Sequence, residues 1–249
     1  MGELAAPRKR FAIEPAALFG TNCPMDFDQF SHIDTWIFDL DNTLYPASCD
    51  LFGLIDARMN AYLRNLFSVD ETEAHRIQKQ YFRDHGTTLS GLMSQHGTDP
   101  HHFLDFVHDI EMDRVSANPD LKDALMALPG RRLVFTNGDV PYAERVLGAL
   151  GLEDCFEAVH DIHMMDYQPK PHPDAYAGFC KAWGVTPTSA LFAEDMARNL
   201  KPAKDIGMTT LWVNNGSEQA GADPCPSFID HETHDITAWL EALYQQEEA

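Results

Sequence analysis

The sequence predicts an α/β fold in which a Rossmann-like parallel sheet carries an inserted, all-helical subdomain. From about residue 119 onward, short apolar segments alternate with segments of helical period, which is typical of a parallel sheet with helices on both faces. Another apolar segment, at residues 35–38, is separated from these by a helical stretch of roughly seventy residues without a strand pattern. A chain of 249 residues is long enough to hold such a core and its insertion.

The first strand is expected at residues 35–38, where Thr-Trp-Ile-Phe combines β-branched and aromatic side chains. A nearly continuous apolar segment of this kind suits a parallel strand that is covered on both faces. The residues before it, 1–32, are interrupted by prolines and show no lasting hydrophobic period. We therefore expect an N-terminal extension over residues 1–32, outside the folded core.

A helical insertion is expected over residues 47–118. Apolar side chains recur there at steps of three and four residues, starting at Leu51 and continuing to Leu66. Further helices are expected at residues 71–84, 89–95 and 100–110, the first of them capped by Asp70 or Thr72.

The α/β core resumes after Asn118-Pro119, so that it comprises residues 33–46 and 119–249. Helices are expected at residues 120–128, 141–150, 173–183, 197–206 and 236–244. Strands are expected at residues 132–136, 158–161, 190–193 and 209–213, with a last edge strand at 227–229.

The chain is strongly acidic, with 18 Lys and Arg residues against 39 Asp and Glu residues and a formal net charge of −21. This charge disfavours nonspecific binding to nucleic acid or to anionic membranes. No apolar run is long enough for a membrane span, and the N-terminus lacks the apolar centre of a secretory signal. The five cysteines are odd in number and widely spaced, which favours reduced thiols in the cytoplasm over a zinc site. A monomer and a dimer are both compatible with this composition.

Polar side chains follow three of the predicted strands at the point where each strand ends. The carboxyl ends of parallel strands meet at one edge of the sheet, where ligands bind. Lys170 follows the strand at 158–161, between two prolines that stiffen its loop. Each motif alone is a common turn or surface feature, but their shared position predicts one site. The strand-end residues are Asp39 and Asp41, then Thr136, Asn137 and Gly138, and finally Glu194 and Asp195.

The carboxylates in this set predict a magnesium site. Adjacent parallel strands lie about 4.8 Å apart, so that Asp39 and Asp195 can share one cation. Mg²⁺ accepts one or two carboxylates together with phosphate oxygens. One carboxylate of the pair Asp39 and Asp41 is then available as a nucleophile, and the other as a general acid and base.

The remaining residues suit a phosphate group. Thr136 and the backbone amides of Asn137 and Gly138 lie at a turn that opens a helix, where anions bind. Lys170 is expected to neutralise charge on the nucleophile and on the transferring group. The expected partner is therefore a small-molecule phosphate ester.

These motifs resemble those of the haloacid dehalogenase superfamily over about residues 33 to 245. The first motif is residues 39–44 (Asp-Leu-Asp-Asn-Thr-Leu), the second is residues 136–138 (Thr-Asn-Gly), the third is Lys170 and the fourth is Glu194-Asp195 with Asn199. The resemblance implies a Rossmann-like core with a helical cap between the first two motifs, and Mg²⁺ as cofactor. The resemblance also implies a role for each residue. Asp39 is the nucleophile and a metal ligand, and Asp41 is the general acid and base and binds the metal through its backbone carbonyl. Thr136 and Lys170 bind the phosphoryl group, Asp195 is a metal ligand, and Glu194 is a further candidate ligand.

Asp41 favours phosphate chemistry within this superfamily. Members that cleave carbon–halogen bonds typically lack an acid two residues after the nucleophile, whereas an alkoxide leaving group needs one. The resemblance therefore implies a phosphomonoesterase that works through an aspartyl-phosphate.

The substrate is expected from a narrower resemblance to the pyrimidine 5′-nucleotidase branch, which implies a nucleoside monophosphate such as UMP or CMP. It rests on residues 41–46, on the segment 81–92 and on the Lys-Pro-His-Pro-Asp core of residues 166–176. Asn42 stands where most sugar-phosphate and phosphoglycolate relatives carry Gly. The alternatives are a sugar-phosphate phosphatase or a phosphomutase of the same fold, and a binding module without activity.

Other polar residues of the insertion are ambiguous. His85, Thr87 and Thr88 are candidates for substrate contact, although a helix-capping role suits the two threonines equally well. Four histidines in the same region are interpreted as exposed residues, because their spacing does not bring them to one face with a carboxylate. They are His96, His101, His102 and His108.

Overall fold

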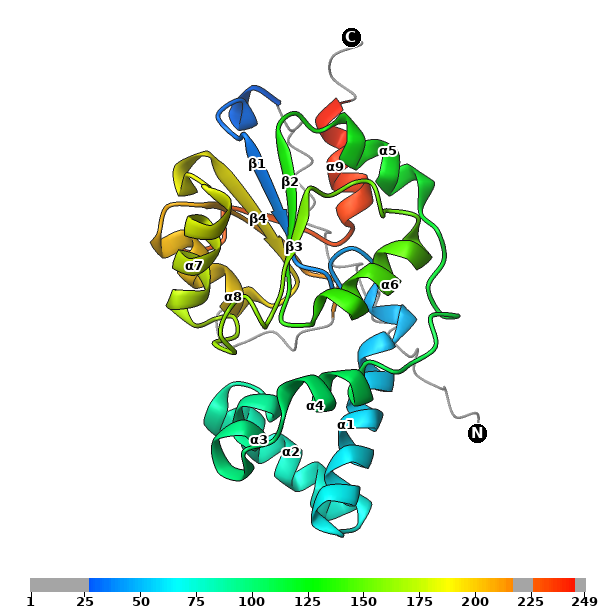
Figure 1. Cartoon of the computed structure of the whole chain (residues 1–249). Coiled ribbons are helices and arrows are strands. Elements are labelled where there is room, and N and C mark those ends of the chain that lie inside the picture. The colour runs from blue at the N-terminus through cyan, green and yellow to red at the C-terminus, as the bar shows by residue number, and fades with distance from the viewer. Residues whose placement is uncertain (1–26, 217–225, 245–249) are drawn as a thin grey trace, which may run out of the picture.

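The computed structural model describes residues 27–216 and 226–244 (Figure 1). The expected N-terminal extension lies largely outside the described residues. Within them, the chain forms one parallel sheet with helices on both faces and a separate group of four helices below it in Figure 1. No helix in the described part of the chain combines the length and apolarity needed to cross a bilayer.

The sheet has six parallel strands in the order β3-β2-β1-β4-β5-β6. They are β1 (Thr35–Phe38), β2 (Arg131–Phe135), β3 (Ala158–His160), β4 (Ala190–Glu194), β5 (Thr209–Val213) and β6 (His231–Thr233). The chain adds β2 and β3 on one side of β1 and then returns to add β4, β5 and β6 on the other side. The connections from neighbouring strands β1 and β4 therefore run in opposite directions. Ligands bind at such a divergence point in open α/β sheets.

Helices cover the sheet on both sides, as the alternating pattern predicts. In Figure 1, α7 and α8 lie on one side, whereas α5, α6 and α9 lie on the other. The helices are α5 (Pro119–Ala127), α6 (Val140–Leu150), α7 (Pro173–Trp183), α8 (Ala197–Asp205) and α9 (Ile236–Tyr244), with short 3₁₀ turns at Phe27–Phe30, Ala47–Cys49 and Pro187–Ser189.

The four helices between β1 and β2 pack on one another and are called the cap below. They are α1 (Leu51–Phe67), α2 (Glu71–His85), α3 (Thr88–His96) and α4 (Pro100–Val107). Asp70, Thr87 and Asp99 accept backbone hydrogen bonds at the starts of α2, α3 and α4, so the capping role weighed for Thr87 is observed.

The predicted last strand was misplaced. Residues 227–229 form a turn, in which Ile229 N donates to Pro226 O, and the strand lies at His231–Thr233. Asp230 accepts a hydrogen bond from Thr210 N at 3.0 Å and anchors the segment beside β5, so pairing begins only after it. The apolar residues Phe228 and Ile229 pack against the core from this turn, whereas the strand itself is polar. Hydrophobicity therefore indicated the wrong three residues.

Candidate active site

The first and fourth motifs meet because β1 and β4 are adjacent. Phe38 pairs with Ala193, and Asp39 N donates to Ala193 O at 2.9 Å. Asp39 therefore leaves the end of β1 beside Glu194 and Asp195 at the end of β4. All three carboxylates are buried, with 1 to 6 % of each residue exposed.

Lys170 lies at the centre of this group. Its Nζ donates to Asp39 Oδ1, to Glu194 Oε2 and to Phe135 O, each at 2.7 Å. The ammonium is 2 % exposed and its three donors meet three acceptors, so its geometry is fully determined by the protein. The structure thus brings Lys170 to Asp39 from 131 residues away in the chain.

The second motif holds the Lys170 loop in place. Asn137 Oδ1 accepts from Lys170 N at 2.8 Å, and Asn137 Nδ2 donates to Lys170 O at 3.1 Å. Thr136 is completely buried, and its Oγ1 accepts from Gly138 N at 3.0 Å. The peptide bond between Lys170 and Pro171 is cis. The Asn137 side chain is therefore engaged with the lysine backbone, and only its backbone amide is left to serve the predicted phosphate site.

The electrostatics of the group show an excess of negative charge. Burial and the neighbouring Glu194 raise the pKa of Asp39 to about 7, although Lys170 opposes this shift. Burial disfavours the charge on Lys170, but Asp39 and Glu194 more than offset this cost and raise its pKa to about 12. One ammonium is thus shared between two buried carboxylates, with a third beside them.

The site fits a hard divalent cation. Asp39, Glu194 and Asp195 each offer an oxygen, and these oxygens lie within 4.8 Å of one another. An all-oxygen set of carboxylates is the ligand type of Mg²⁺ rather than of Zn²⁺. The sequence left Glu194 as an additional candidate ligand. In the structure it offers one oxygen to this group, as Asp39 and Asp195 do.

Asp41 is placed differently from Asp39. Tyr45 and Tyr142 donate their hydroxyls to the same oxygen, Asp41 Oδ1, at 2.5 and 2.7 Å. Burial, followed by the charge of Asp41, raises the pKa of both phenols well above their usual range, so both stay protonated donors. The hydroxyl groups of Tyr45 and Tyr142 therefore fix the orientation of Asp41. Asp39 has one such contact, because Thr43 donates its hydroxyl to Asp39 Oδ2 at 3.0 Å.

The backbone explains one detail of the first motif. Asn42 has a φ of 56°, in the left-handed region, and its carbonyl accepts a hydrogen bond from Asn215 Nδ2. Glycine and asparagine are the residues that adopt this conformation most readily. Asn42 therefore satisfies the same backbone demand as Gly, which weakens its value as a marker of substrate.

A cavity of about 360 Å³ connects these strand ends with the cap. Asp39, Asp41, Lys170, Glu194 and Asp195 line its core side. Residues of α1, α2, α3 and α4 line the opposite side, among them Phe52, Gln78, Phe82, Leu89 and Phe103. Thr87 and Thr88, considered as substrate contacts, face this cavity, whereas His85 lines a neighbouring one.

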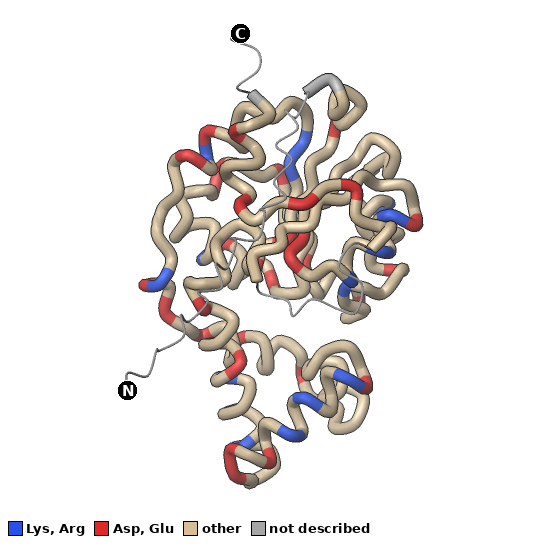
Figure 2. Tube along the Cα trace, turned by 180° about the vertical axis from the view of Figure 1, so that it is seen from behind, with Lys and Arg blue, Asp and Glu red and all other residues tan. Residues whose placement is uncertain are grey.

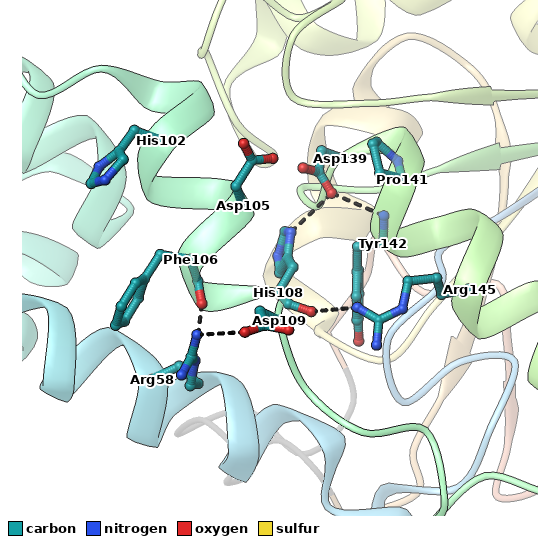
Figure 3. A pocket seen from close by; sticks show the side chains of 10 residues that line it. All are labelled: Arg58, His102, Asp105, Phe106, His108, Asp109, Asp139, Pro141, Tyr142 and Arg145. Atoms are coloured by element: carbon teal, nitrogen blue, oxygen red, sulfur yellow. Dashed lines mark hydrogen bonds and ion pairs between the residues drawn. The ribbon is translucent and has the colours of Figure 1, made fainter.

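His108 was wrongly expected to be exposed. It is 8 % exposed, its Nδ1 lies 2.9 Å from Asp139 Oδ1, and its ring stacks on Tyr142 at 4.4 Å. It borders a second cavity, of about 470 Å³, shown in Figure 3, where Arg145 also binds His108 O. The residue follows α4 directly, so the C-terminal end of the cap is fastened to the start of α6. His96, His101 and His102 are exposed, as expected.

Several residues of the site were not found from the sequence. Tyr142 and His108 reach the site only because α6 packs against the end of the cap. The local sequence pattern does not predict this packing. Tyr45 and Thr43 carried a signal, because each lies four residues after the aspartate that it contacts.

The family follows from this fold together with a direct comparison. Residues 33–207 match the model of the haloacid dehalogenase-like hydrolases, so the chain belongs to this family of hydrolases.

Three curated relatives are similar to parts of the chain. Phosphate metabolism protein 8 of Saccharomyces cerevisiae is 25 % identical over 189 residues, 70 % of this chain and 59 % of that protein. The glyceraldehyde 3-phosphate phosphatase of Methanopyrus kandleri is 27 % identical over 74 % of this chain and 84 % of its own length. The (S)-2-haloacid dehalogenase of Xanthobacter autotrophicus is 31 % identical, over 43 % of each chain.

A solved structure has the same fold. The HAD phosphatase from Thermococcus onnurineus superposes with a TM-score of 0.58 at 17 % identity, covering 85 % of this chain and 98 % of that one.

Proposed function

We propose that this chain is a Mg²⁺-dependent phosphomonoesterase that works through an aspartyl-phosphate on Asp39, with a pyrimidine nucleoside monophosphate as substrate and a cytoplasmic location. The observation that carries the proposal is the buried group of Asp39, Glu194 and Asp195 around Lys170, open to a cavity that Asp41 also lines. The helices over residues 47–118 serve as its cap, and residues 33–46 and 119–249 as its catalytic core. Two of the relatives carry phosphate metabolism or phosphatase activity in their names, which agrees with this chemistry.

The reaction has two displacement steps. A carboxylate oxygen of Asp39 attacks phosphorus, the bond from phosphorus to the ester oxygen breaks, and Asp41 gives its proton to the leaving alkoxide. Asp41 then takes a proton from water, the water oxygen bonds to phosphorus, and the bond to Asp39 breaks to release inorganic phosphate.

The surrounding residues supply positioning and charge. Lys170 holds Asp39 at 2.7 Å and contributes a positive charge in a buried site, where charge stabilisation is strong. Asp39, Glu194 and Asp195 would hold Mg²⁺ through their carboxylate oxygens. When bound, Mg²⁺ supplies a Lewis acid that offsets the charge of the phosphate and of these carboxylates.

Asp41 favours phosphate chemistry over the dehalogenation named for one relative. Its carboxylate lines the cavity beside Asp39 and is oriented by Tyr45 and Tyr142. An acid held so firmly is needed where a poor leaving group must be protonated, and a halide leaves without a proton.

The test is hydrolysis of a panel of phosphate esters in Mg²⁺, with 2-chloropropionate as the dehalogenase substrate. We expect release of phosphate from UMP and CMP above that from sugar phosphates, and no release of chloride. Asp39→Asn should abolish turnover, whereas Asp84→Asn, the same change at an exposed position of α2, should not. Chloride release without phosphate release contradicts the proposal, and a preference for sugar phosphates contradicts its nucleotidase part.

A further inference from the structure

The cavity above the catalytic group contains one polar side chain whose hydrogen bonding is incomplete. Gln78 lies in the middle of α2, is only 3 % exposed and lines the cavity. Its Oε1 is buried and has no hydrogen-bond partner. A buried polar atom without a partner costs about 1–3 kcal/mol, so such atoms are rare and call for an explanation.

The orientation of the Gln78 amide is determined by its neighbours. Nε2 donates to Asp56 Oδ1 at 2.7 Å and contacts Met59 Sδ at 3.7 Å. A carboxylate only accepts hydrogen bonds when ionised, so it selects the NH₂ end of the amide. Oε1 is therefore the end of the amide without a protein partner, and a group that pairs with it must be a hydrogen-bond donor.

We propose that Gln78 is a specificity residue that accepts a hydrogen bond from an N–H group at the edge of the leaving group's base, which makes the cavity a nucleobase site. This inference rests on the phosphatase function proposed above and deepens it.

The walls around Gln78 favour a flat ring over a polyol. Phe52, Met59, Phe82 and Leu89 line the same cavity, and the two phenylalanines are 50 % and 39 % exposed. Aromatic and thioether surfaces pack well on the face of an aromatic ring, whereas the hydroxyls of an open sugar would lose their water there. A nucleobase combines apolar faces with N–H groups at its edge, so it satisfies both the walls and Gln78.

The size and closure of the cavity agree with a small nucleotide. Its volume of about 360 Å³ lies at the small end of small-molecule sites, about 300–1,000 Å³. The guanidinium of Arg198, from α8 of the core, lies 4.8 Å from the ring centre of Phe82, from α2 of the cap. This cation–π contact joins core and cap beside the cavity, which both residues line.

The test compares UMP with 3-methyl-UMP, in which the only ring N–H is replaced by a methyl group, and with p-nitrophenyl phosphate, which has no donor. For the unaltered protein, methylation should lower kcat/KM by about tenfold to a hundredfold. In Gln78→Leu, kcat/KM for UMP should fall relative to that for p-nitrophenyl phosphate by a similar factor, and UMP should lose its advantage over 3-methyl-UMP. Gln95→Leu, the same change at an exposed position of α3, should keep the full advantage.

The outcomes separate this inference from the function on which it rests. Equal rates on UMP and 3-methyl-UMP in the unaltered protein, or an unchanged ratio in Gln78→Leu, overturn the role of Gln78 while phosphatase activity persists. Absence of phosphate release from every ester, p-nitrophenyl phosphate included, overturns the phosphatase function itself. The comparison of the two nucleotides in the unaltered protein needs no variant, so it holds even if Gln78→Leu folds poorly.

Discussion

Asp41 owes its fixed orientation to Tyr45 and Tyr142, which lie on either side of the cap in the sequence. One phenol follows β1 and the other belongs to the first turn of α6, yet both donate to the same oxygen. The second carboxylate oxygen is thereby left for the substrate. The two phenols also lie 3.5 Å apart, so their positions depend on each other.

Replacing either phenol should impair the acid/base step more than substrate binding. We expect Tyr45→Phe and Tyr142→Phe each to lower kcat by about tenfold to a hundredfold, with a smaller change in KM, because one donor to a charged group contributes roughly 1.5–3 kcal/mol. The measurement is steady-state kinetics on UMP, with p-nitrophenyl phosphate as a substrate whose good leaving group needs less proton donation. A loss of equal size on both substrates would indicate a structural effect instead.

His160 provides a pH dependence that is independent of the site. It is 2 % exposed, and its Nδ1 accepts from Trp183 Nε1 at 3.2 Å. Burial lowers the pKa of His160 to about 4, from an ordinary value near 6.5 in the unfolded chain. The unfolded chain thus binds the proton more readily, so the contribution of His160 to stability is complete above pH 6.5 and is lost as the pH falls toward 4.

His160→Asn should remove this part of the acid sensitivity. Asparagine keeps an acceptor near the position of Nδ1 but does not titrate. We expect the free energy of unfolding of the unaltered protein to drop by up to about 3 kcal/mol more than that of the variant between pH 7 and pH 4. Urea unfolding at a series of pH values measures this difference, and parallel curves for the two proteins would contradict it.

At the scale of helices and strands, apolar patterning predicted the interior of the fold better than its edges. The strand Thr209–Val213 and the helices Pro173–Trp183 and Ile236–Tyr244 lie where they were expected, because continuous apolar runs or helical periods mark them. The edge strand β6 is a polar His-Glu-Thr segment that pairs through its backbone with β5. Its side chains form no apolar run, so the sequence pattern did not predict it. The fourth cap helix ends at Val107 instead of residue 110, where His108 turns toward Asp139.

The packing of α2 against α3 depends on Gly91. A Cβ at this position would lie 2.5–2.9 Å from the ring and Cβ of Tyr81, closer than such atoms approach. Gly91→Ala should therefore push α3 away from α2 and destabilise the protein by about 1–3 kcal/mol, the usual cost of overpacking. Gly178→Ala, at a helical glycine with open space around it, should be neutral or slightly stabilising.

Thermal unfolding of these two variants compares the predictions directly. The helices α2 and α3 also line the cavity, so Gly91→Ala should lower kcat/KM on UMP as well. An unchanged midpoint would contradict the close contact at Tyr81.

At the scale of the whole molecule, the candidate site depends on contacts that join distant parts of the chain. The strand-end rule was sufficient to predict that Asp39 and Asp195 share one edge of the sheet, whereas Lys170 was predicted there from its proline-flanked loop after the strand at 158–161. The rule could not predict that Asn137 would bind the backbone of Lys170, because that depends on the conformation of two loops. The rule also could not predict that His108 is buried, because the sequence around a polar residue at a helix end does not show whether that residue is buried or exposed.

The net charge of −21 should make catalysis on anionic esters sensitive to ionic strength. Figure 2 shows acidic residues over both the core and the cap, and basic residues are fewer. A phosphate monoester therefore approaches against the field of the whole protein, although Lys170 and a bound cation attract it at short range. Salt screens the distant charges, with a Debye length of about 10 Å at 0.1 M, but acts little on the buried site.

Raising NaCl from 10 to 150 mM at constant Mg²⁺ should therefore increase kcat/KM on UMP severalfold and leave kcat nearly constant. The nucleoside formed by the reaction is uncharged, so its inhibition constant serves as the control and should not change. A fall in kcat/KM with added salt would mean that the local positive charge of the site governs the approach, and that the acidic surface has little influence on it.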